Sequence, residues 1–422
     1  MEEQKSEHSG FYGLGIAPVI LDILGKLKFT MPTPIQAQAI PSAIQGKDVV
    51  GIAQTGTGKT LAFGIPMIQL LAKSGKRGLV VLPTRELALQ VEEALRRIGG
   101  SMGMRTVVLI GGASFVPQKR DLMRRPHVII ATPGRLLDHL NQRNVSLSDI
   151  GIAVLDEADR MLDMGFLPQI QKILHALHNE RQTMLFSATM PHEIMKIAAG
   201  YMKLPVRIEV APAGTTADRV AQEVFIVPRE QKLALLLKLL EQYKGSALVF
   251  SRTKYGAEKI MRQIRAGGIS AAELHSNRSL SQRREALEGF KRGTYRVLVA
   301  TDIASRGIDV AGIETVINFD LPATSEDYVH RIGRTARAGA EGRAVTFATP
   351  QEQRDIRGIE RMIRKSIPVS RLPELPRVAP AAFVPEEPRR QERRPYGRQG
   401  GFVRTGSASR GRRPFQRTAR WK

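Results

Sequence analysis

The sequence predicts an α/β protein made of two tandem domains, each with a parallel β-sheet covered by helices. Short apolar runs alternate with stretches of 3.6-residue periodicity, which is typical of parallel sheets that are buried on both faces. The alternation stops at a short polar segment and then starts again. The chain of 422 residues is also too long for one compact core.

The first domain is expected over residues 26–210, after an N-terminal extension at residues 1–25. Its helices include RELALQVEEALRRIG at 85–99, in which apolar residues recur every three or four positions. Its candidate strands are short runs rich in Val, Ile and Leu. They are DVVGIA at 48–53, GLVVL at 78–82, RTVVLI at 105–110, HVIIA at 127–131, IAVLD at 152–156 and TMLFSA at 183–188.

The segment APAGTTADR at 211–219 is small, polar and marked by Pro and Gly, which predicts a linker between domains. The second domain is expected over residues 220–365. Its candidate strands follow the same pattern and are EVFIV at 223–227, SALVF at 246–250, RVLVA at 296–300, ETVINF at 314–319 and RAVTFA at 343–348.

Residues 366–422 lose this pattern and are expected to form a disordered, Arg-rich tail, because they cannot bury enough apolar surface to fold alone. Within residues 386–422, eleven arginines and Lys422 face three glutamates, a net charge of +9. The rest of the chain carries +15 of the total of +24. A basic body with a basic tail indicates a polyanionic partner, above all RNA, although charge can also serve only solubility.

The chain contains no cysteine, so neither a disulfide nor a thiolate metal site is possible. No apolar run reaches the roughly 18 residues of a membrane span. The polar opening MEEQKSEHSGFYGLG lacks the apolar core of a secretory signal. We therefore expect a cytoplasmic protein that is monomeric and does not associate with membranes.

A glycine-rich segment, AQTGTGKT at 53–60, directly follows a candidate strand and opens a helical stretch. Its glycines allow a tight turn whose backbone N–H groups face an anion. Lys59 can place its ammonium group against the outer phosphates of a nucleotide, and the hydroxyl of Thr60 can bind Mg²⁺. A chance glycine-rich turn would lack this strand and helix. The candidate nucleotide-binding residues are Ala53, which stands where Gly is usual, and Gln54, Thr55, Gly56, Thr57, Gly58, Lys59 and Thr60.

The segment IAVLDEAD at 152–159 ends a buried strand in three carboxylates, which repel one another and resist leaving water. A carboxylate at a strand end beside a phosphate loop can hold Mg²⁺, which assigns Asp156 to the metal. Glu157 can orient or deprotonate the water that attacks the γ-phosphate. Acids also occur at helix N-termini for mild stabilisation, which accounts for Asp159 better than for the other two.

The second half lacks a phosphate loop but contains HRIGRTARAG at 330–339. Arg331, Arg334 and Arg337 are spaced three apart, so on a helix they would lie near one face. They could form a solvated basic face or an RNA-binding stripe. They could also supply arginine fingers that complete an ATP site from across a cleft, which would make domain closure a requirement for hydrolysis.

Several motifs together resemble the DEAD-box RNA helicase family, and their order and spacing agree over roughly residues 11–365. Singly, most could be an ordinary helix start or turn. The resemblance implies two RecA-like domains with ATP and RNA at the interdomain cleft, and the short linker and tail are most similar to the bacterial RhlE-type subgroup. The motifs are FTMPTPIQ at 29–36, PTRELALQ at 83–90, TPGR at 132–135, DEAD at 156–159, SAT at 187–189, VATDIASRGIDV at 299–310 and HRIGRTARAG.

The resemblance also implies contacts to ATP and RNA. Phe29 should stack on adenine and Gln36 should read its edge, while Phe11 supports that site and Asp309 approaches the ribose. The residues implied to contact the RNA sugar-phosphate backbone are Arg85, Gly112, Thr132 and Arg135 in the first domain and Arg283 and Thr301 in the second.

Further implied roles concern hydrolysis and its coupling to RNA. Arg334 and Arg337 match the finger positions of the family. Ser187 and Thr189 should link the hydrolysis site to the RNA-bound closed state through Asp159. The implied catalytic set is Lys59, Asp156, Glu157, Ser187, Thr189, Arg334 and Arg337, and the implied coupling residues are Asp159 and His330.

Two positions depart from the family pattern. Leu280 stands where Gln often precedes the Arg of the LSQR segment, which puts the RNA contact of Arg283 in doubt. Ala336 stands where Gly is usual, which is a small change.

The expected function is an ATP-dependent RNA helicase with Mg²⁺, which hydrolyses ATP to ADP and phosphate when stimulated by RNA. It would separate short RNA duplexes or remodel RNA–protein complexes. An ATP-timed RNA clamp or protein-displacing remodeller with little unwinding is the alternative, and a DNA helicase or translocase is a third. RNA-processing or ribosome-assembly proteins are candidate partners.

Overall fold

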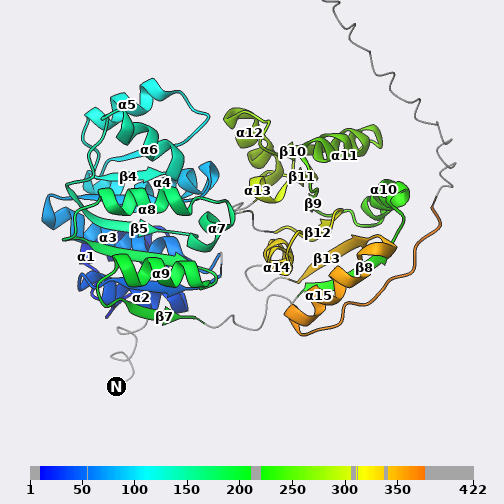
Figure 1. The fold of residues 1–422 in the computed structure, drawn as a ribbon, viewed down its shortest axis with the longest axis horizontal. Helices are drawn as coiled ribbons and strands as arrows, with labels where there is room; N and C mark the ends of the chain where they lie inside the picture. Colours follow the sequence, from blue (N-terminus) through cyan, green and yellow to red (C-terminus); the bar gives the residue numbers. More distant parts are fainter. Residues whose placement is uncertain are drawn as a thin grey trace, which may run out of the picture. The chain divides into compact units, whose positions relative to one another are not determined.

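The structure, a computed structural model, describes residues 10–54, 56–210, 220–305, 310, 312–336 and 341–375. These residues form two α/β domains, and the named strands within each sheet pair in parallel (Figure 1). The fold class predicted from the alternating pattern is confirmed. Within this described part of the chain, no helix is long and apolar enough to cross a membrane.

The first domain contains a seven-stranded sheet in the order β3-β4-β2-β5-β6-β1-β7. The strands are β1 Val49–Ile52, β2 Arg77–Val81, β3 Thr106–Leu109, β4 Val128–Ala131, β5 Ile150–Leu155, β6 Gln182–Ser187 and β7 Val206–Glu209. The helices are α1 Pro18–Lys26, α2 Pro34–Ile44, α3 Lys59–Ser74, α4 Arg85–Gly99, the 3₁₀ helix η2 Gly100–Met102, α5 Phe115–Met123, α6 Pro133–Asn141, α7 Ala158–Asp163, α8 Leu167–Ala176 and α9 His192–Tyr201.

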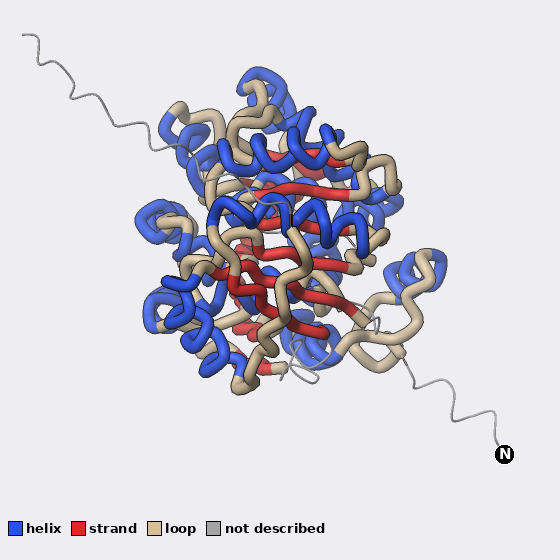
Figure 2. The backbone as a smooth tube through the Cα atoms, turned by 90° about the vertical axis from the view of Figure 1, so that its right-hand side faces the viewer, coloured by secondary structure: helices blue, strands red, loops and turns tan. Residues whose placement is uncertain are grey.

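Helices cover both faces of this sheet, as Figures 1 and 2 show. Alternate strand residues enter two different cores. Val49 and Val80 pack with α1–α4 on one face, whereas Val50 and Val81 pack with α6–α9 on the other. Burial on both faces explains why the strands appear in the sequence as continuous apolar runs.

The strand order places three functional segments at one edge of the sheet. The strand β6 lies between β5 and β1. The phosphate loop follows β1, the DEAD segment follows β5, and the SAT segment begins at the end of β6. Because the carboxyl ends of parallel strands meet at the same edge, these segments become neighbours.

The second domain contains a six-stranded sheet in the order β10-β11-β9-β12-β13-β8. The strands are β8 Val220–Ile226, β9 Ala247–Phe250, β10 Ala271–Leu274, β11 Val297–Ala300, β12 Thr315–Asn318 and β13 Gly342–Ala348. The α-helices are α10 Lys232–Gln242, α11 Lys254–Ala266, α12 Leu280–Lys291, α13 Asp302–Ser305, α14 Ser325–Ile332 and α15 Gln353–Ile363, and the 3₁₀ helices are η3 Arg229–Gln231 and η4 Pro350–Glu352.

Two strands, β7 and β10, were not predicted from the sequence. The strand β7 is a four-residue edge strand in which only Ile208 is buried. The strand β10 reads AAEL, and Ala and Glu have low strand propensity. In both cases the pairing with a neighbouring strand, rather than local sequence, determines the structure.

The expected domain limits need two corrections. Residues 10–25 belong to the first domain rather than to a separate extension, because Phe11, Ile20 and Leu24 lie in its core. The expected tail begins too early at residue 366. Part of the segment up to residue 375 lies alongside the edge strand β8. There the backbone N–H of Val224 donates to the carbonyl oxygen of Pro368 at 2.9 Å, and its carbonyl oxygen accepts from the N–H of Ser370 at 2.9 Å. The predicted linker at 211–219 and the rest of the tail lie outside the described residues.

Candidate functional site

The phosphate loop leads from β1 into α3 through two glycines in left-handed conformations. Gly56 has φ of 88° and Gly58 has φ of 87°, values that side chains with a Cβ disfavour. A Cβ at Gly58 would also lie 2.3 Å from Nε2 of Gln36. The glycine at 58 is therefore required twice, for its backbone angle and for the close approach of Gln36.

Gln36 connects the predicted adenine site to this loop. Its side-chain Nε2 donates to the carbonyl oxygen of Gly58 at 3.0 Å, and its Oε1 accepts from the backbone N–H of Thr33 at 3.0 Å. The second bond is part of a capping box that starts α2. Phe29 remains 39% exposed, so its ring is free to cover a base, whereas Phe11 is buried in the core beneath.

Lys59, the first residue of α3, lies between the phosphate loop and the acidic segment. Its Nζ donates to the carbonyl oxygen of Ala53 at 3.1 Å and lies 3.0 Å from Oε1 of Glu157. The adjacent Thr60 is half-buried at the start of the same helix, and Thr57 closes the turn by donating to the carbonyl oxygen of Gln54 at 2.7 Å. Thr55 lies outside the described residues.

The acidic segment turns sharply at Glu157, directly after β5. Glu157 is the N-cap of α7 and has φ of 55°, a left-handed conformation that is strained for a residue with a Cβ. Its backbone N–H donates to Oδ1 of Asp156 at 2.9 Å. Both carboxylates are buried. Strain of this kind persists where the surroundings fix a residue for function.

The two buried carboxylates have opposite pKa shifts. Burial alone would raise the pKa of Glu157, but the charges of Arg160 and Lys59 outweigh it and hold this pKa well below its ordinary value. Burial raises the pKa of Asp156 to about 7, and the charge of Glu157 adds to the shift. Burial thus disfavours a charge on Asp156, whereas the neighbouring cations favour the ionised form of Glu157.

Arg160 is a site residue that the sequence reasoning missed. Its side chain is fully buried at 0% exposure, and its Nε lies 3.2 Å from Oε2 of Glu157. Glu157 is thus held between two cations, Lys59 and Arg160, one on each carboxylate oxygen. The spacing of three residues from Glu157 on a helix was the only sequence signal for this pair.

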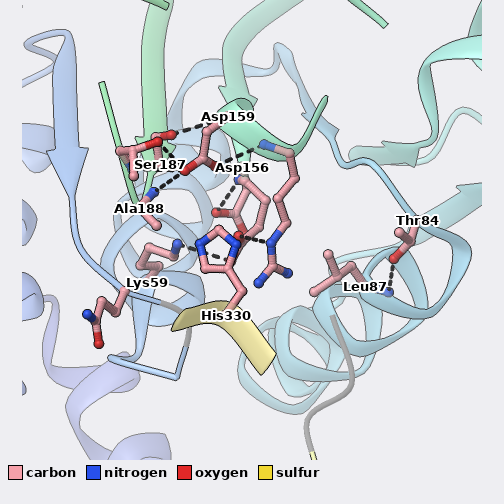
Figure 3. A network of polar contacts seen from close by, with 12 residues as sticks. Lys59, Thr84, Leu87, Asp156, Asp159, Ser187, Ala188 and His330 are labelled. Atoms are coloured by element: carbon pink, nitrogen blue, oxygen red, sulfur yellow. Dashed lines mark hydrogen bonds and ion pairs between the residues drawn. The ribbon is translucent and has the colours of Figure 1, made fainter. Parts of the chain in front are cut away.

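Asp159 joins the DEAD segment to the SAT segment (Figure 3). Its Oδ2 accepts from the backbone N–H groups of Ala188 and Thr189 at 3.1 and 2.8 Å and from the Thr189 hydroxyl at 2.9 Å. Its own backbone N–H donates to Oγ of Ser187 at 3.1 Å. These residues therefore form one hydrogen-bonded unit, and their role in coupling hydrolysis to RNA binding stays a prediction.

The arginines of the second domain do not share one helix face. The helix α14 ends at Ile332, so Arg331 lies on it and Arg334 lies after it. Arg331 is committed to its own domain, where its Nε and Nη2 contact the carboxylate of Asp302 at 2.6 and 2.7 Å. Arg334 is buried and donates to the carbonyl oxygen of His330 at 3.3 Å. Arg337 lies outside the described residues.

Electrostatics link Arg334 and His330 to the acidic segment. The positive charge of Arg334 lowers the pKa of Glu157, although burial and the charges of Arg160 and Lys59 have larger effects. Burial, followed by the charge of Arg160, lowers the pKa of His330 to about 4. His330 is therefore neutral at pH 7 and lies beside this network (Figure 3).

Two of the predicted RNA-contacting residues of the first domain, Gly112 and Arg135, lie near the guanidinium group of Arg85. Arg85 begins α4, whose N-cap is Thr84. Arg135 donates to the carbonyl oxygen of Ala113 at 3.0 Å, and Thr132 holds the N-cap position of α6 without a side-chain capping bond. Burial and the charges of Arg283 and Arg135 lower the pKa of Arg85. Several guanidinium groups therefore gather near one another, an arrangement suited to a polyanion.

Replacing Gly112 with Ala is expected to weaken RNA binding while ATP binding persists. A Cβ at Gly112 would lie 2.1 Å from Nη1 of Arg85, so the guanidinium group must move. Gly103→Ala is the matched control, because Gly103 has a similar φ of 77° but no atom within 4 Å of a Cβ. Equal RNA affinity of the two variants in fluorescence titrations would contradict the role of this Arg85 position.

In the second domain, Arg283 makes a contact that the sequence did not predict. Its Nε lies 2.6 Å from Oε1 of Glu86 in the PTREL segment, and its Nη1 donates to the carbonyl oxygen of His275 at 3.1 Å. Thr301 is half-buried at the end of β11. Its backbone N–H donates to the carbonyl oxygen of Leu274 at 3.2 Å. Asp309 lies outside the described residues.

The oxygen donors at the loop fit a small hard cation. In the described part of the chain, no group of three or more His, Asp or Glu side chains could hold a metal by itself. Mg²⁺ characteristically uses one or two protein carboxylates together with substrate phosphates and water. The carboxylate of Asp156 and the hydroxyl of Thr60 are donors of this kind, and the raised pKa of Asp156 reflects a buried carboxylate that a cation would stabilise.

Comparisons with known proteins agree with this site. The model of the DEAD/DEAH box helicase family matches residues 33–197, and that of the helicase conserved C-terminal domain matches residues 231–339. The chain is 43% identical over 362 residues to the ATP-dependent rRNA helicase RRP3 of Debaryomyces hansenii, covering 85% of this chain and 76% of that protein. It is 42% identical over 360 residues to the DEAD-box ATP-dependent RNA helicase CshA of Bacillus cereus, covering 85% and 69%.

A solved structure of S. cerevisiae Dbp5 bound to RNA and ADP BeF3 matches with a TM-score of 0.77 and 28% identity, over 86% of this chain and 95% of that one. These relatives do not test the RhlE-type subgroup, which stays a prediction. The family models, the identity to full-length relatives and the assembled motifs lead to one conclusion. The chain belongs to the DEAD-box family of ATP-dependent RNA helicases.

Proposed function

We propose that this protein hydrolyses ATP when stimulated by RNA and uses the cycle to separate short RNA duplexes locally or to remodel RNA–protein complexes. The observation that carries the proposal is the position of Asp159. It lies two residues after the proposed catalytic Glu157 and accepts three hydrogen bonds from Ala188 and Thr189. A change at the hydrolysis site can therefore be transmitted to the SAT segment through one carboxylate.

Each side chain of the site has a chemical task in this proposal. Lys59 neutralises the outer phosphates of ATP, and Glu157 orients the attacking water and accepts its proton. Arg334, with Arg337, stabilises the charge that develops on the transferred phosphoryl group. Asp156 and Thr60 would hold Mg²⁺, which would further neutralise the phosphate charge.

We further propose that RNA is bound mainly through its sugar-phosphate backbone and largely without regard to sequence. The guanidinium groups near Arg85 support this mode. Because RRP3 is named an rRNA helicase, ribosomal RNA and the proteins that assemble on it are the first partners to test. A monomer acting in the cytoplasm without membrane association remains our expectation.

Strand displacement with short RNA duplexes tests the proposal directly. We expect ATP-dependent release of one labelled strand, together with an ATPase rate that rises with RNA. RNA-stimulated ATPase activity without displacement would instead favour an ATP-timed RNA clamp. Equal stimulation by single-stranded DNA would contradict the preference for RNA.

Deleting residues 386–422 is expected to weaken RNA affinity and to flatten its dependence on salt. The segment carries a net charge of +9, and each lost phosphate contact lowers the slope of log K against log salt by about 0.7 for a single strand. The ATPase activity at saturating RNA should survive. Unchanged RNA affinity across a salt series, measured against the full chain, would assign the tail another role.

A further inference from the structure

We propose that one face of α15 is a second RNA-binding surface, which holds the phosphodiester backbone of RNA outside the motif-lined site. The surface, called here the α15 basic face, consists of Arg354, Arg357 and Arg361 on the helix and of Arg364 and Lys365, which directly follow its end. These side chains line a hollow of about 750 Å³. None of the residues implied by the family motifs lies on this helix.

The sequence of α15 separates apolar and basic residues onto different faces. Ile356 and Ile359 are buried against β8, β13 and α14, and Figure 1 shows this helix beside those elements. Arg354, Arg357 and Arg361 recur at intervals of three and four and are all exposed, so they follow one helical ridge. The core anchors the helix, and the ridge faces outward.

The positive charge of this face is not compensated locally. Glu360 is the one carboxylate that lines the hollow, and its Oε1 already accepts from the backbone N–H of Ile367 at 2.9 Å. Across the described residues, none of the five basic side chains lies within ion-pair distance of a carboxylate. Like charges three or four residues apart destabilise a helix. A bound polyanion would reduce this repulsion between the basic side chains.

The chemistry and extent of the face favour an RNA backbone over a small anion. Four of its five cations are arginines, whose planar guanidinium groups bind phosphate in a bidentate manner. From Arg354 to Arg361 the helix rises about 10 Å, and Arg364 and Lys365 extend the face beyond the helix end, so it can meet successive phosphates. The face also lies on the last helix of the described residues, on the side of the chain from which the Arg-rich sequence at residues 386–422 follows.

The inference rests on the proposed function for its ligand and is tested by comparing RNAs of two lengths. The full chain and the triple variant Arg354→Gln, Arg357→Gln, Arg361→Gln are titrated with each RNA over a salt series. One RNA is a short single strand that fills only the motif-lined site, and the other carries a long flanking extension. The matched control is Lys238→Gln, Lys244→Gln, Lys259→Gln, which removes the same charge from exposed positions of the same domain.

We expect the triple arginine variant to bind the long RNA more weakly, with a salt slope lower by about two for three lost phosphate contacts. Its affinity for the short RNA and its ATPase rate at saturating short RNA should match the unmodified chain. Equal loss on both RNAs, equal loss in the lysine control, or no loss on the long RNA would overturn the inference. If the unmodified chain bound neither RNA, the proposed function itself would fail.

Discussion

Replacing Glu157 with Gln is expected to lower the rate of ATP hydrolysis by about 10²- to 10⁴-fold while ATP and RNA still bind. Gln keeps the size of the side chain but cannot accept a proton from water. The lowered pKa of Glu157, which arises because Arg160 and Lys59 outweigh burial, keeps the wild-type carboxylate ionised, so it can accept a hydrogen bond from the attacking water. Single-turnover ATPase measurements with saturating RNA report this step.

The matched control for this variant is Glu193→Gln. Glu193 lies in the first turn of α9 in the same domain and is exposed. Its replacement removes the same charge without touching the site, so the ATPase rate should stay within about twofold of wild type, since surface changes are usually small in energy. Normal RNA-stimulated hydrolysis by Glu157→Gln would remove this residue from the catalytic role and would leave another base to be found.

Much of the first domain was predictable because its strands are buried on both faces. Val49 and Val50 alternate between two cores, so the strand remains apolar at every position and is conspicuous in the sequence. The strand β10 offers no such signal, because Ala and Glu become strand residues only by pairing with β11. Ladder pairing between distant segments is not encoded in local composition.

The candidate site divides in the same way. The phosphate loop could be predicted, because a Gly-rich turn between a strand and a helix is a specific sequence signal. Contacts that depend on where a helix ends could not be predicted. The spacing of Arg331 and Arg334 suggested one helical face, but α14 ends at Ile332 and directs the two arginines differently. The pair of Arg283 with Glu86 joins residues 197 positions apart, a distance over which local patterns carry no information.

Arg160 illustrates a further limit. In a sequence, an arginine three residues after a glutamate on a short helix usually indicates a solvated pair worth a few tenths of a kcal/mol. Here the side chain is buried and lies beside the ionised carboxylate of Glu157, which is buried as well. Its importance follows from its burial, which the spacing of residues in the sequence does not reveal.

Replacing Arg160 with Met is expected to lower the free energy of unfolding by about 3–5 kcal/mol, because removing one partner leaves a buried charge less compensated. Lys59 would then remain within ion-pair distance of Glu157, and the charge of Arg160 beside both carboxylates would be lost. Urea denaturation of the two chains at pH 7 measures the change. The control is Arg96→Met, since Arg96 is 65% exposed and pairs with Glu92 at 3.4 Å, which should cost only about 0.5 kcal/mol.

The pH dependence of this difference gives an independent check. Because the pKa of Glu157 is lower in the folded chain than its ordinary value of 4.5, ionised Glu157 stabilises the fold fully above pH 4.5. This stabilisation is lost as the pH falls from 4.5 through the pKa of the folded chain. The gap between wild type and Arg160→Met should therefore narrow on acidification below pH 4.5.

A double-mutant cycle identifies the partner. If Arg160 acts through Glu157, the double variant Glu157→Gln, Arg160→Met should be more stable than the two single changes predict when added, because neither buried charge then lacks its partner. A strictly additive cycle would mean that Arg160 stabilises the domain through its packing alone, and the electrostatic account of the site would have to be abandoned.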